Sequence, residues 1–279
     1  MFVPDLLKGK RILVTGGGTG LGKSMGRRFL ELGAELVICG RRRSVLEETT
    51  AEFQAAFPGR VSWHACDVRD ADAIETMMDG IWATGPLDVL VNNAAGNFIA
   101  KTETLSPRAV DAVLNIVLHG AAYCTIACGR RWLAERHKAT VLSIVTTYAS
   151  TGSGYVVPSA MAKAGVLAMT RSLAAEWGGR GVRLNAIAPG PFPTPGAWER
   201  LVPRPDLARE FEGRNPLGRV GDHRELADLA SFLVSDGSGF INGDVVTIDG
   251  GGWVKGAGQF NFLERLTDAD WEALRPKKS

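Results

Sequence analysis

A glycine-rich turn near the amino end limits the possible folds of this chain more than any other segment. It reads Thr15-Gly16-Gly17-Gly18-Thr19-Gly20-Leu21-Gly22, between a short β-branched run at Arg11–Thr15 and a helical pattern over Gly20–Gly33. In this context Gly16 permits a tight turn, Gly20 lets backbone approach a pyrophosphate, and Gly22 allows the helix to pack close to the sheet. Backbone amides at the positive helix end favour phosphate. The turn predicts a dinucleotide site on an α/β sheet.

Strand-like and helix-like segments alternate along the chain, which predicts βαβ units and a parallel sheet. We expect a single-domain, Rossmann-type doubly wound sheet of about seven strands, and the 279 residues suit one such domain. The expected strands are Arg11–Thr15, Glu35–Cys39, Val61–Ala65, Leu87–Val91, Thr140–Val145, Val182–Ala188 and Asp244–Ile248. The expected helices are Gly20–Gly33, Ser44–Phe57 with Ser44 as its cap, Ala71–Ala83, Pro107–Arg136 unless it breaks near Gly120, Pro158–Trp177 and Arg224–Val234.

Two segments stand apart from this alternation. A proline-rich stretch at 189–215 follows a strand, where an α/β fold places a substrate loop. The tail at 253–279 carries apolar residues at loosely helical spacing, which need a surface to cover. We expect a reductase domain over 1–252 and a carboxyl-terminal extension over 253–279 that packs on the domain or on a neighbouring subunit.

Composition narrows the partners and the setting. A net charge of +2 gives no general bias toward nucleic acid. The cysteines at 39, 66, 124 and 128 form no Cys-x-x-Cys pair, and no histidine follows them at zinc-ligand spacing. We therefore expect buried free thiols, no metal and a reducing, cytoplasmic setting. The amino end lacks a signal-like segment, and we expect no apolar run of the roughly 20 residues that a membrane helix needs.

Two further stretches follow expected strands, Asp67-Val68 and Asn92-Asn93-Ala94-Ala95-Gly96. With the glycine turn they mark the carboxyl edge of the sheet, where open α/β sheets bind ligands. The second strand ends Cys39-Gly40-Arg41-Arg42-Arg43, without the carboxylate that would accept bonds from the ribose of NAD. Arginine pairs with a 2′-phosphate, so we predict NADPH, with Arg41 as its contact.

The glycine turn and the Asn92–Gly96 stretch resemble those of the short-chain dehydrogenase/reductase family. The resemblance implies that Asp67 and Val68 frame the adenine, and that Asn92–Gly96 supports the ribose and the central strand. It places Thr146, Ser159 and Lys163 at the family's Ser, Tyr and Lys positions, and Val117 where a helper asparagine is expected. Serine is a far poorer acid than a phenol, whose pKa is about 10. The implied cofactor contacts are Gly16, Thr19, Gly20, Leu21, Gly22, Arg41, Asp67, Val68, Asn93, Ala94, Ala95, Lys163, Pro189 and Gly190.

Ser159, at the position where the family has tyrosine, restricts the resemblance to one subfamily. The stretches Asn92–Ile99 and Tyr148–Ala160 are similar to those of the NADPH-dependent 2,4-dienoyl-CoA reductases, in which serine also replaces the usual tyrosine. That likeness implies that Tyr148 and Asn97 hold a thioester carbonyl, that Lys163 binds the nicotinamide ribose and that Ser159 is a lesser partner. His119 departs from the subfamily, which has asparagine there.

The predicted reaction is NADPH-dependent reduction of a conjugated 2,4-dienoyl-CoA to a 3-enoyl-CoA. Charge would collect on the thioester oxygen, so paired donors are needed there rather than a strong acid. Three alternatives stay open: a 2-enoyl-CoA reductase, a carbonyl reductase or alcohol dehydrogenase with Tyr148 or Tyr155 as acid, and a silent NADP(H)-binding sensor or structural subunit. Phe192 and Trp198 are expected wall residues of the substrate site, and the family likeness implies a homotetramer.

Overall fold

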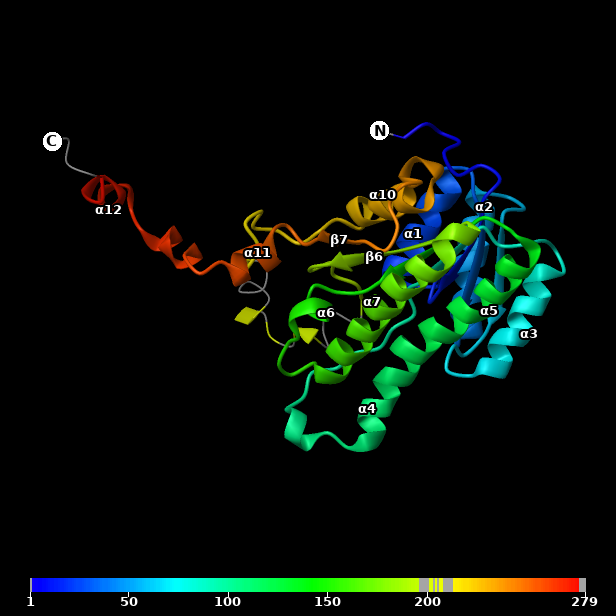
Figure 1. Ribbon diagram of the computed structural model, residues 1–279, viewed down its shortest axis with the longest axis horizontal. Coiled ribbons are helices and arrows are strands. Elements are labelled where there is room, and N and C mark those ends of the chain that lie inside the picture. The colour runs from blue at the N-terminus through cyan, green and yellow to red at the C-terminus, as the bar shows by residue number, and fades with distance from the viewer. Residues whose placement is uncertain (1, 196–200, 203, 205, 208–212, 276–279) are drawn as a thin grey trace.

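The strands form one parallel sheet in the computed structural model of the chain, which describes residues 2–195, 201–202, 204, 206–207 and 213–275 (Figure 1). Within these residues the sheet has seven strands in the order β3-β2-β1-β4-β5-β6-β7, and every neighbouring pair is parallel. Their bounds are β1 Arg11–Thr15, β2 Glu35–Gly40, β3 Val61–Ala65, β4 Val89–Asn92, β5 Ala139–Ile144, β6 Val182–Pro189 and β7 Val245–Ile248. The predicted doubly wound sheet is confirmed.

Helices cover both faces of this sheet (Figure 1). The α-helices are α1 Gly20–Glu31, α2 Arg43–Ala56, α3 Ala71–Trp82, α4 Pro107–Leu114, α5 Gly120–Glu135, α6 Tyr148–Thr151, α7 Val157–Trp177, α10 His223–Val234, α11 Gly252–Ala257 and α12 Asp268–Ala273. Short 3₁₀ turns lie at Thr102–Thr104, Gly178–Arg180, Asp236–Ser238 and Asn261–Arg265.

Each face of the sheet has its own apolar core. One core joins the sheet to α1, α2 and α10 through residues such as Phe29, Phe53 and Leu226. The other joins it to α3, α5 and α7 through residues such as Met78 and Trp132. Strands that are buried on both faces consist largely of branched apolar residues, as a covered parallel sheet requires.

Side-chain caps fix the start of several helices. The Asp70 carboxylate accepts bonds from the amides of Asp72 and Ala73 at the start of α3. Asp222 and Glu225 form a capping box at the start of α10. The prediction that Ser44 caps the second helix is wrong, because α2 begins one residue earlier and Arg42 occupies the cap position without a side-chain bond.

The long helix predicted over Pro107–Arg136 does not break at Gly120. A π-helical turn at Asn115–His119 joins α4 to α5, so one extra residue is inserted while the helix continues. The resulting stretch Pro107–Glu135 is long and apolar enough to cross a membrane by length and composition, and an 18-residue window within it has a mean hydropathy of 1.5. The expectation that no stretch reaches that length is therefore wrong. Half of the apolar window is buried inside the protein, as in a core helix.

The tail leaves the body of the protein after β7. Figure 1 shows α11 and α12 projecting away from the sheet. Thr267 and Asp270 cap α12 reciprocally, and Lys255 pairs with Glu264 at 2.8 Å, so the segment has local structure. Its large apolar side chains are exposed, namely Trp253, Val254, Phe260, Phe262, Trp271 and Leu274. Packing of this tail on a neighbouring subunit stays a prediction.

The contact between α5 and α7 generates a stability prediction. A Cβ at Gly129 would lie 2.4 Å from the Trp177 ring, which is buried. We expect Gly129→Ala to force the helices apart and to lower the free energy of unfolding by about 1–3 kcal/mol. Thermal unfolding should show a fall in Tm of about 2–10 °C.

The matched control is Gly179→Ala, where an added Cβ meets nothing within 4 Å. That variant should unfold within about 1 °C of the parent chain, because surface substitutions usually have small effects. An equal fall in Tm for both variants would contradict the packing assigned to Gly129.

Candidate active site

The site lies where the strand order reverses, between β1 and β4. The buried Thr15 hydroxyl accepts bonds from the amides of Asn93 and Ala94, each at 3.0 Å, and donates to the Val91 carbonyl at 3.3 Å. The Asn93 side-chain amide donates in return to the carbonyls of Thr15 and Gly16, at 2.9 and 3.3 Å. The loops that follow β1 and β4 are thereby held against each other at the edge where such sheets bind ligands.

The glycine turn has the conformation that its sequence predicts. Gly16 and Gly20 adopt positive φ values of 66° and 53°, which glycine tolerates best. A Cβ at Gly22 would lie 2.5 Å from both the Gly16 carbonyl oxygen and Asn93 Nδ2. Gly22 was expected to allow close packing of helix and sheet. The structure shows that it lets the first turn of α1 pack on the glycine turn itself.

The amino end of α1 has no side-chain cap. Thr19 occupies the cap position without a capping bond, and the first turn contains no acidic residue. The positive end of the helix dipole and its amides therefore face the turn without an anion from the protein. Together with the bare glycine backbone, this arrangement fits the phosphates of a dinucleotide.

The arginine cluster after β2 is exposed. Arg43 lies 3.8 Å from Glu47 and stacks 5.2 Å from the Trp63 ring. For Arg41 and Arg42, no salt bridge is formed within the described part of the chain. Asp67, after β3, binds Arg69, and this hydrogen bond together with the charges of Arg69 and Arg41 lowers the pKa of Asp67. Arg41 and Asp67 therefore lie near each other at the expected adenine end of the site.

Three predicted reacting residues meet in one hydrogen-bonded chain. Asn97 Nδ2 donates to the Tyr148 hydroxyl at 3.3 Å, and that hydroxyl lies 3.1 Å from Ser159 Oγ. Ser159 is buried, whereas Tyr148 and Asn97 are half-buried. The Phe98 amide donates to Asn97 Oδ1 at 2.9 Å, which turns the Asn97 amide nitrogen toward Tyr148. The three side chains come from the loop after β4, from α6 and from α7.

Tyr148 lies beyond the end of β5, at the start of a short helix. Strand β5 ends at Ile144, and the Thr146 hydroxyl accepts a bond from the Tyr148 amide at 3.2 Å. The chain then forms the short helix α6, which begins at Tyr148 and contacts α7. Tyr148 thereby reaches Ser159, 11 residues further along the chain.

Lys163 lies one helical turn after Ser159 and is buried. Its ammonium donates to the Ile144 carbonyl at the end of β5. Burial lowers the pKa of Lys163 to about 8. Val117, at the expected asparagine position, packs with Ala162 in an apolar cluster. His119 Nδ1 lies 2.8 Å from Asn115 Oδ1 within the π turn.

The structure separates other predicted residues from this chain. Tyr155 has a left-handed φ of 66° and a side chain that is 67% exposed, while Tyr148 contacts Ser159. Phe192 packs on the core beside α1 and α10 and against Gly221, so it anchors the proline-rich segment to the core. Gly190 donates to the Ile248 carbonyl at 2.9 Å after β6 ends at Pro189. Trp198 lies outside the described residues.

Sequence reasoning missed several residues that shape the site. Thr15 carries the contact between the two loops, and its signal was a polar residue at the end of a buried strand just before glycine. Thr194 lies against Gly20, whose Cβ would be 3.2 Å from Thr194 Cγ2. Ser24 and His223 bond to each other at 2.8 Å across 199 residues, for which the sequence has no local signal.

Comparison with known proteins agrees with this geometry. The enoyl-(acyl carrier protein) reductase family model matches residues 16–252. A Bacillus subtilis protein named probable 2,4-dienoyl-CoA reductase, (2E)-enoyl-CoA-producing, is 44% identical over 88% of this chain and 97% of its own. A Caenorhabditis elegans protein named probable 2,4-dienoyl-CoA reductase 3, (3E)-enoyl-CoA-producing, is 44% identical over 88% of this chain and 81% of its own.

Solved structures share the fold. A short-chain dehydrogenase from Bacillus anthracis superposes with a TM-score of 0.81 at 43% identity, covering 88% of this chain and 97% of its own. A gluconate 5-dehydrogenase from Burkholderia cenocepacia, in complex with NADP and tartrate, superposes at 0.83 with 28% identity and covers 89% and 97%. The chain belongs to the short-chain dehydrogenase/reductase family, and it is an oxidoreductase of the kind that uses a nicotinamide cofactor.

The buried Lys163 generates a prediction on stability against pH. Its pKa falls from 10.5 to about 8 on folding. Below pH 8 the folded protein carries a buried positive charge, which lowers its stability. Between pH 8 and 10.5 the unfolded chain binds a proton at Lys163 that the folded protein does not, so the free energy of unfolding rises with pH. We expect Lys163→Met to raise the free energy of unfolding at pH 7 by about 1–2 kcal/mol, after the lost bond to Ile144 is subtracted.

Urea unfolding at pH 7, 8, 9 and 10 checks this prediction. The advantage of Lys163→Met should shrink as the pH rises toward 10.5, whereas the exposed Lys101→Met should show no such trend. A difference that stays constant over this range would contradict the burial of a charged Lys163.

Proposed function

We propose that this chain catalyses NADPH-dependent reduction of a conjugated 2,4-dienoyl-CoA to a 3-enoyl-CoA. The observation that carries the proposal is the chain of Asn97, Tyr148 and Ser159, in which a tyrosine from α6 lies against the serine at the family's tyrosine position. Two donors on half-buried side chains are thus available side by side, next to a buried lysine. This set suits stabilisation of an oxyanion better than protonation of an alkoxide.

The hydrogen bonds leave protons free for a substrate oxygen. When Ser159 donates to Tyr148, the Tyr148 hydroxyl hydrogen is free, and Asn97 Nδ2 has a second hydrogen beyond the one given to Tyr148. In a dienoyl thioester that receives a hydride at the carbon remote from the carbonyl, charge spreads over a dienolate and collects on the thioester oxygen. Donors aimed at that oxygen lower the barrier because they stabilise charge where it develops. Water then protonates the α-carbon.

The residues at the edge of the sheet fit NADPH. The uncapped amides of α1 and the glycine turn would hold its phosphates, Arg41 its 2′-phosphate and Lys163 its nicotinamide ribose. When bound, NADPH supplies the hydride. The positive field of Lys163 adds to the two donors at the thioester oxygen. The NADP bound by the Burkholderia cenocepacia relative supports NADPH over NADH as the cofactor.

The names of the relatives support the substrate class and differ in the product. The Bacillus subtilis protein is named for a (2E)-enoyl product and the Caenorhabditis elegans protein for a (3E)-enoyl product. We infer the 3-enoyl product for this chain, because Ser159 is a weak acid and the α-carbon of the dienolate takes its proton from water.

An absorbance assay tests the proposal against its alternatives. The protein is mixed with NADPH and a 2,4-dienoyl-CoA, with a 2-enoyl-CoA and a 3-ketoacyl-CoA in parallel. Fast loss of absorbance with the dienoyl thioester alone is the expected result. Turnover of the 2-enoyl or 3-ketoacyl substrate instead would point to the other reductases. Binding of NADPH without any turnover would point to a silent sensor.

The position of the tail supports an oligomer. Its exposed apolar residues over 253–275 project from the body (Figure 1), so they find no cover on their own sheet. We infer that they pack on a neighbouring subunit of a homotetramer. The cytoplasmic setting inferred from the free cysteines stays a prediction.

Removal of the Tyr148 hydroxyl should separate catalysis from cofactor binding. Tyr148→Phe is expected to lower kcat for the dienoyl thioester by about 10²–10³, the usual loss when one oxyanion donor is removed. Fluorescence titration should give the same Kd for NADPH as the parent, because the hydroxyl is not needed for the phosphates.

The matched control is Tyr155→Phe, whose side chain is exposed. It should keep kcat within about twofold of the parent. Loss of turnover in Tyr155→Phe, or an equal loss of NADPH binding in Tyr148→Phe, would overturn the role given to Tyr148.

Arg41 should set the preference for NADPH over NADH. A lost charge-assisted bond to phosphate is worth about 1.5–3 kcal/mol, so Arg41→Ala should raise KM for NADPH by about 10–100-fold. KM for NADH should change little, since NADH lacks the 2′-phosphate. Arg43→Ala, which also removes one positive charge but engages Glu47 and Trp63, is the control. An equal rise of KM in both variants would rule out a specific contact from Arg41.

A further inference from the structure

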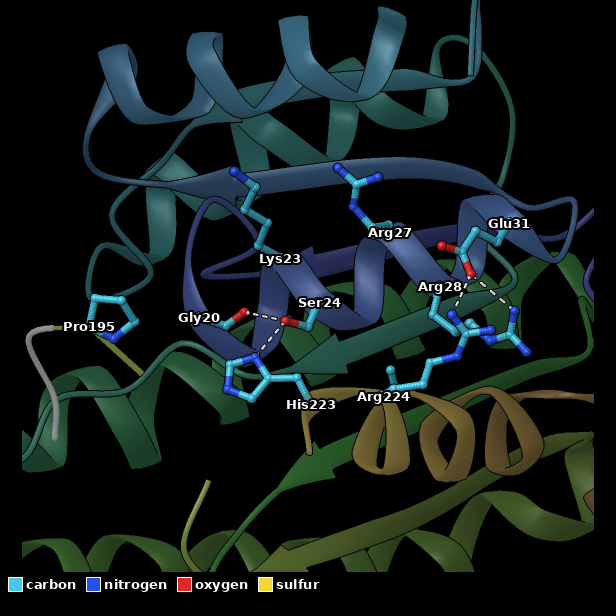
Figure 2. A pocket seen from close by; sticks show the side chains of 10 residues that line it. Gly20, Lys23, Ser24, Arg27, Arg28, Glu31, Pro195, His223 and Arg224 are labelled. Carbon is cyan, nitrogen blue, oxygen red and sulfur yellow. Dashed lines mark hydrogen bonds and ion pairs between the residues drawn. The ribbon is translucent and has the colours of Figure 1, made fainter. Parts of the chain in front are cut away.

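One histidine joins three separate segments of the site. His223, the first residue of α10, lies 2.8 Å from Ser24 Oγ through Nδ1 and 2.7 Å from the Pro193 carbonyl oxygen through Nε2. Ser24 Oγ also lies 3.1 Å from the Gly20 carbonyl oxygen in the glycine turn. Figure 2 shows the Gly20–Ser24–His223 part of this chain, with Pro195 beside it. The glycine turn and the start of the proline-rich segment are thus linked through α10.

Hydrogen-bond chemistry fixes the tautomer of His223. A carbonyl oxygen only accepts, so Nε2 must carry the hydrogen that is donated to Pro193. In the neutral ring Nδ1 is then an acceptor, and the single hydroxyl hydrogen of Ser24 is donated either to Nδ1 or to the Gly20 carbonyl oxygen. Nε2 therefore holds the ring to Pro193, and Nδ1 holds it from the other side when the Ser24 hydroxyl donates to it.

The linked segments also touch directly at the turn. An added Cβ on Gly20 would lie 3.2 Å from Thr194 Cγ2, so Thr194 rests on the residue that is expected to approach the pyrophosphate. Pro193, the acceptor for His223, is the residue before Thr194. A shift of Pro193 would therefore move Thr194 relative to the phosphate-binding backbone.

A cavity adjoins this link, so packing is incomplete there and the hydrogen bonds of His223 contribute to holding Pro193. His223, Ser24 and Gly20 line a cavity of about 370 Å³ between α1 and α10. The cations in that cavity are already paired: Lys23 with Glu52 at 2.6 Å, Arg27 also with Glu52, and Arg28 and Arg224 with Glu31 at 3.0 and 3.1 Å. Arg28 and Arg224 further share Asp228. The cavity is thus no free anion site, and its chemistry centres on His223.

We propose that His223 is a positioning residue that holds Pro193 and Thr194 over the glycine turn, and so prepares the turn for NADPH. It touches neither the reacting atoms nor the donors Tyr148 and Asn97. Its effect is on cofactor affinity, through the backbone of the turn and the placement of Thr194. The inference rests on the proposed function only in taking NADPH as the ligand.

Two substitutions of His223 separate positioning from simple packing. His223→Leu removes both bonds at similar volume, whereas His223→Gln keeps an N–H donor for Pro193 and an oxygen acceptor for Ser24. We expect His223→Leu to raise the Kd for NADPH about tenfold, equivalent to ~1.4 kcal/mol. His223→Gln should stay within about twofold, and kcat at saturating NADPH should change less than about twofold in both.

Fluorescence titration with NADPH, thermal unfolding without it and kcat measurement make up the test. Ser24→Ala removes the contacts of Ser24 Oγ with His223 and Gly20 but leaves the bond from His223 to Pro193. It should raise Kd by an intermediate amount, and it serves as a second variant if His223→Leu does not fold. Unchanged Kd in His223→Leu and Ser24→Ala would overturn the inference. A similar fall in Tm or kcat in both His223→Leu and His223→Gln would also overturn it.

The outcomes are distinct from a failure of the proposed function. A parent chain that binds NADPH but reduces no dienoyl thioester would refute the reaction, while the effect of His223 on Kd would still be measurable. A parent chain that reduces the thioester with Kd unaffected by His223→Leu would refute the positioning role alone.

Discussion

Two polar side chains at the reversal of strand order, Thr15 and Asn93, fix the active edge of this protein. Each bonds to the backbone of the other's loop, so the turn after β1 and the loop after β4 cannot move independently. Buried polar groups of this kind are stable only when they are paired, which makes the contact specific as well as stabilising. This contact fixes the glycine turn after β1 and, in the loop after β4, the position of Asn97.

The replacement of tyrosine by Ser159 changes the chemistry without removing the machinery. A serine cannot protonate an alkoxide as a phenol does, yet its hydroxyl still orients Tyr148, which α6 brings from 11 residues upstream. Asn97 completes the chain, and Lys163 contributes a buried cation whose pKa is lowered by burial. A conjugated thioester needs this distribution of donors, because its negative charge develops on the carbonyl oxygen and not at the carbon that receives hydride.

The sequence predicted the sheet well because branched runs bounded by turn residues define buried strands, and Arg11–Thr15 and Val61–Ala65 match the structure residue for residue. It misplaced the start of α2 and missed the π turn at Asn115–His119, since helical periodicity does not register one inserted residue. Tyr148, Asn97 and Ser159 were found through short motifs with a family likeness. The bond between His223 and Ser24 was not, because it depends on how α10 packs on α1 and on no local pattern.

Reduction of a 2,4-dienoyl-CoA with NADPH carrying deuterium at the transferable position of the nicotinamide, followed by NMR of the product, separates the possible reactions. The proposed reaction delivers hydride to the carbon remote from the thioester, so the deuterium should appear on C5. The double bond should lie between C3 and C4, and the new hydrogen on the α-carbon should come from water. Deuterium on C3 with the double bond still between C4 and C5 would show simple enoyl reduction. That result would contradict a dienolate held by Tyr148 and Asn97.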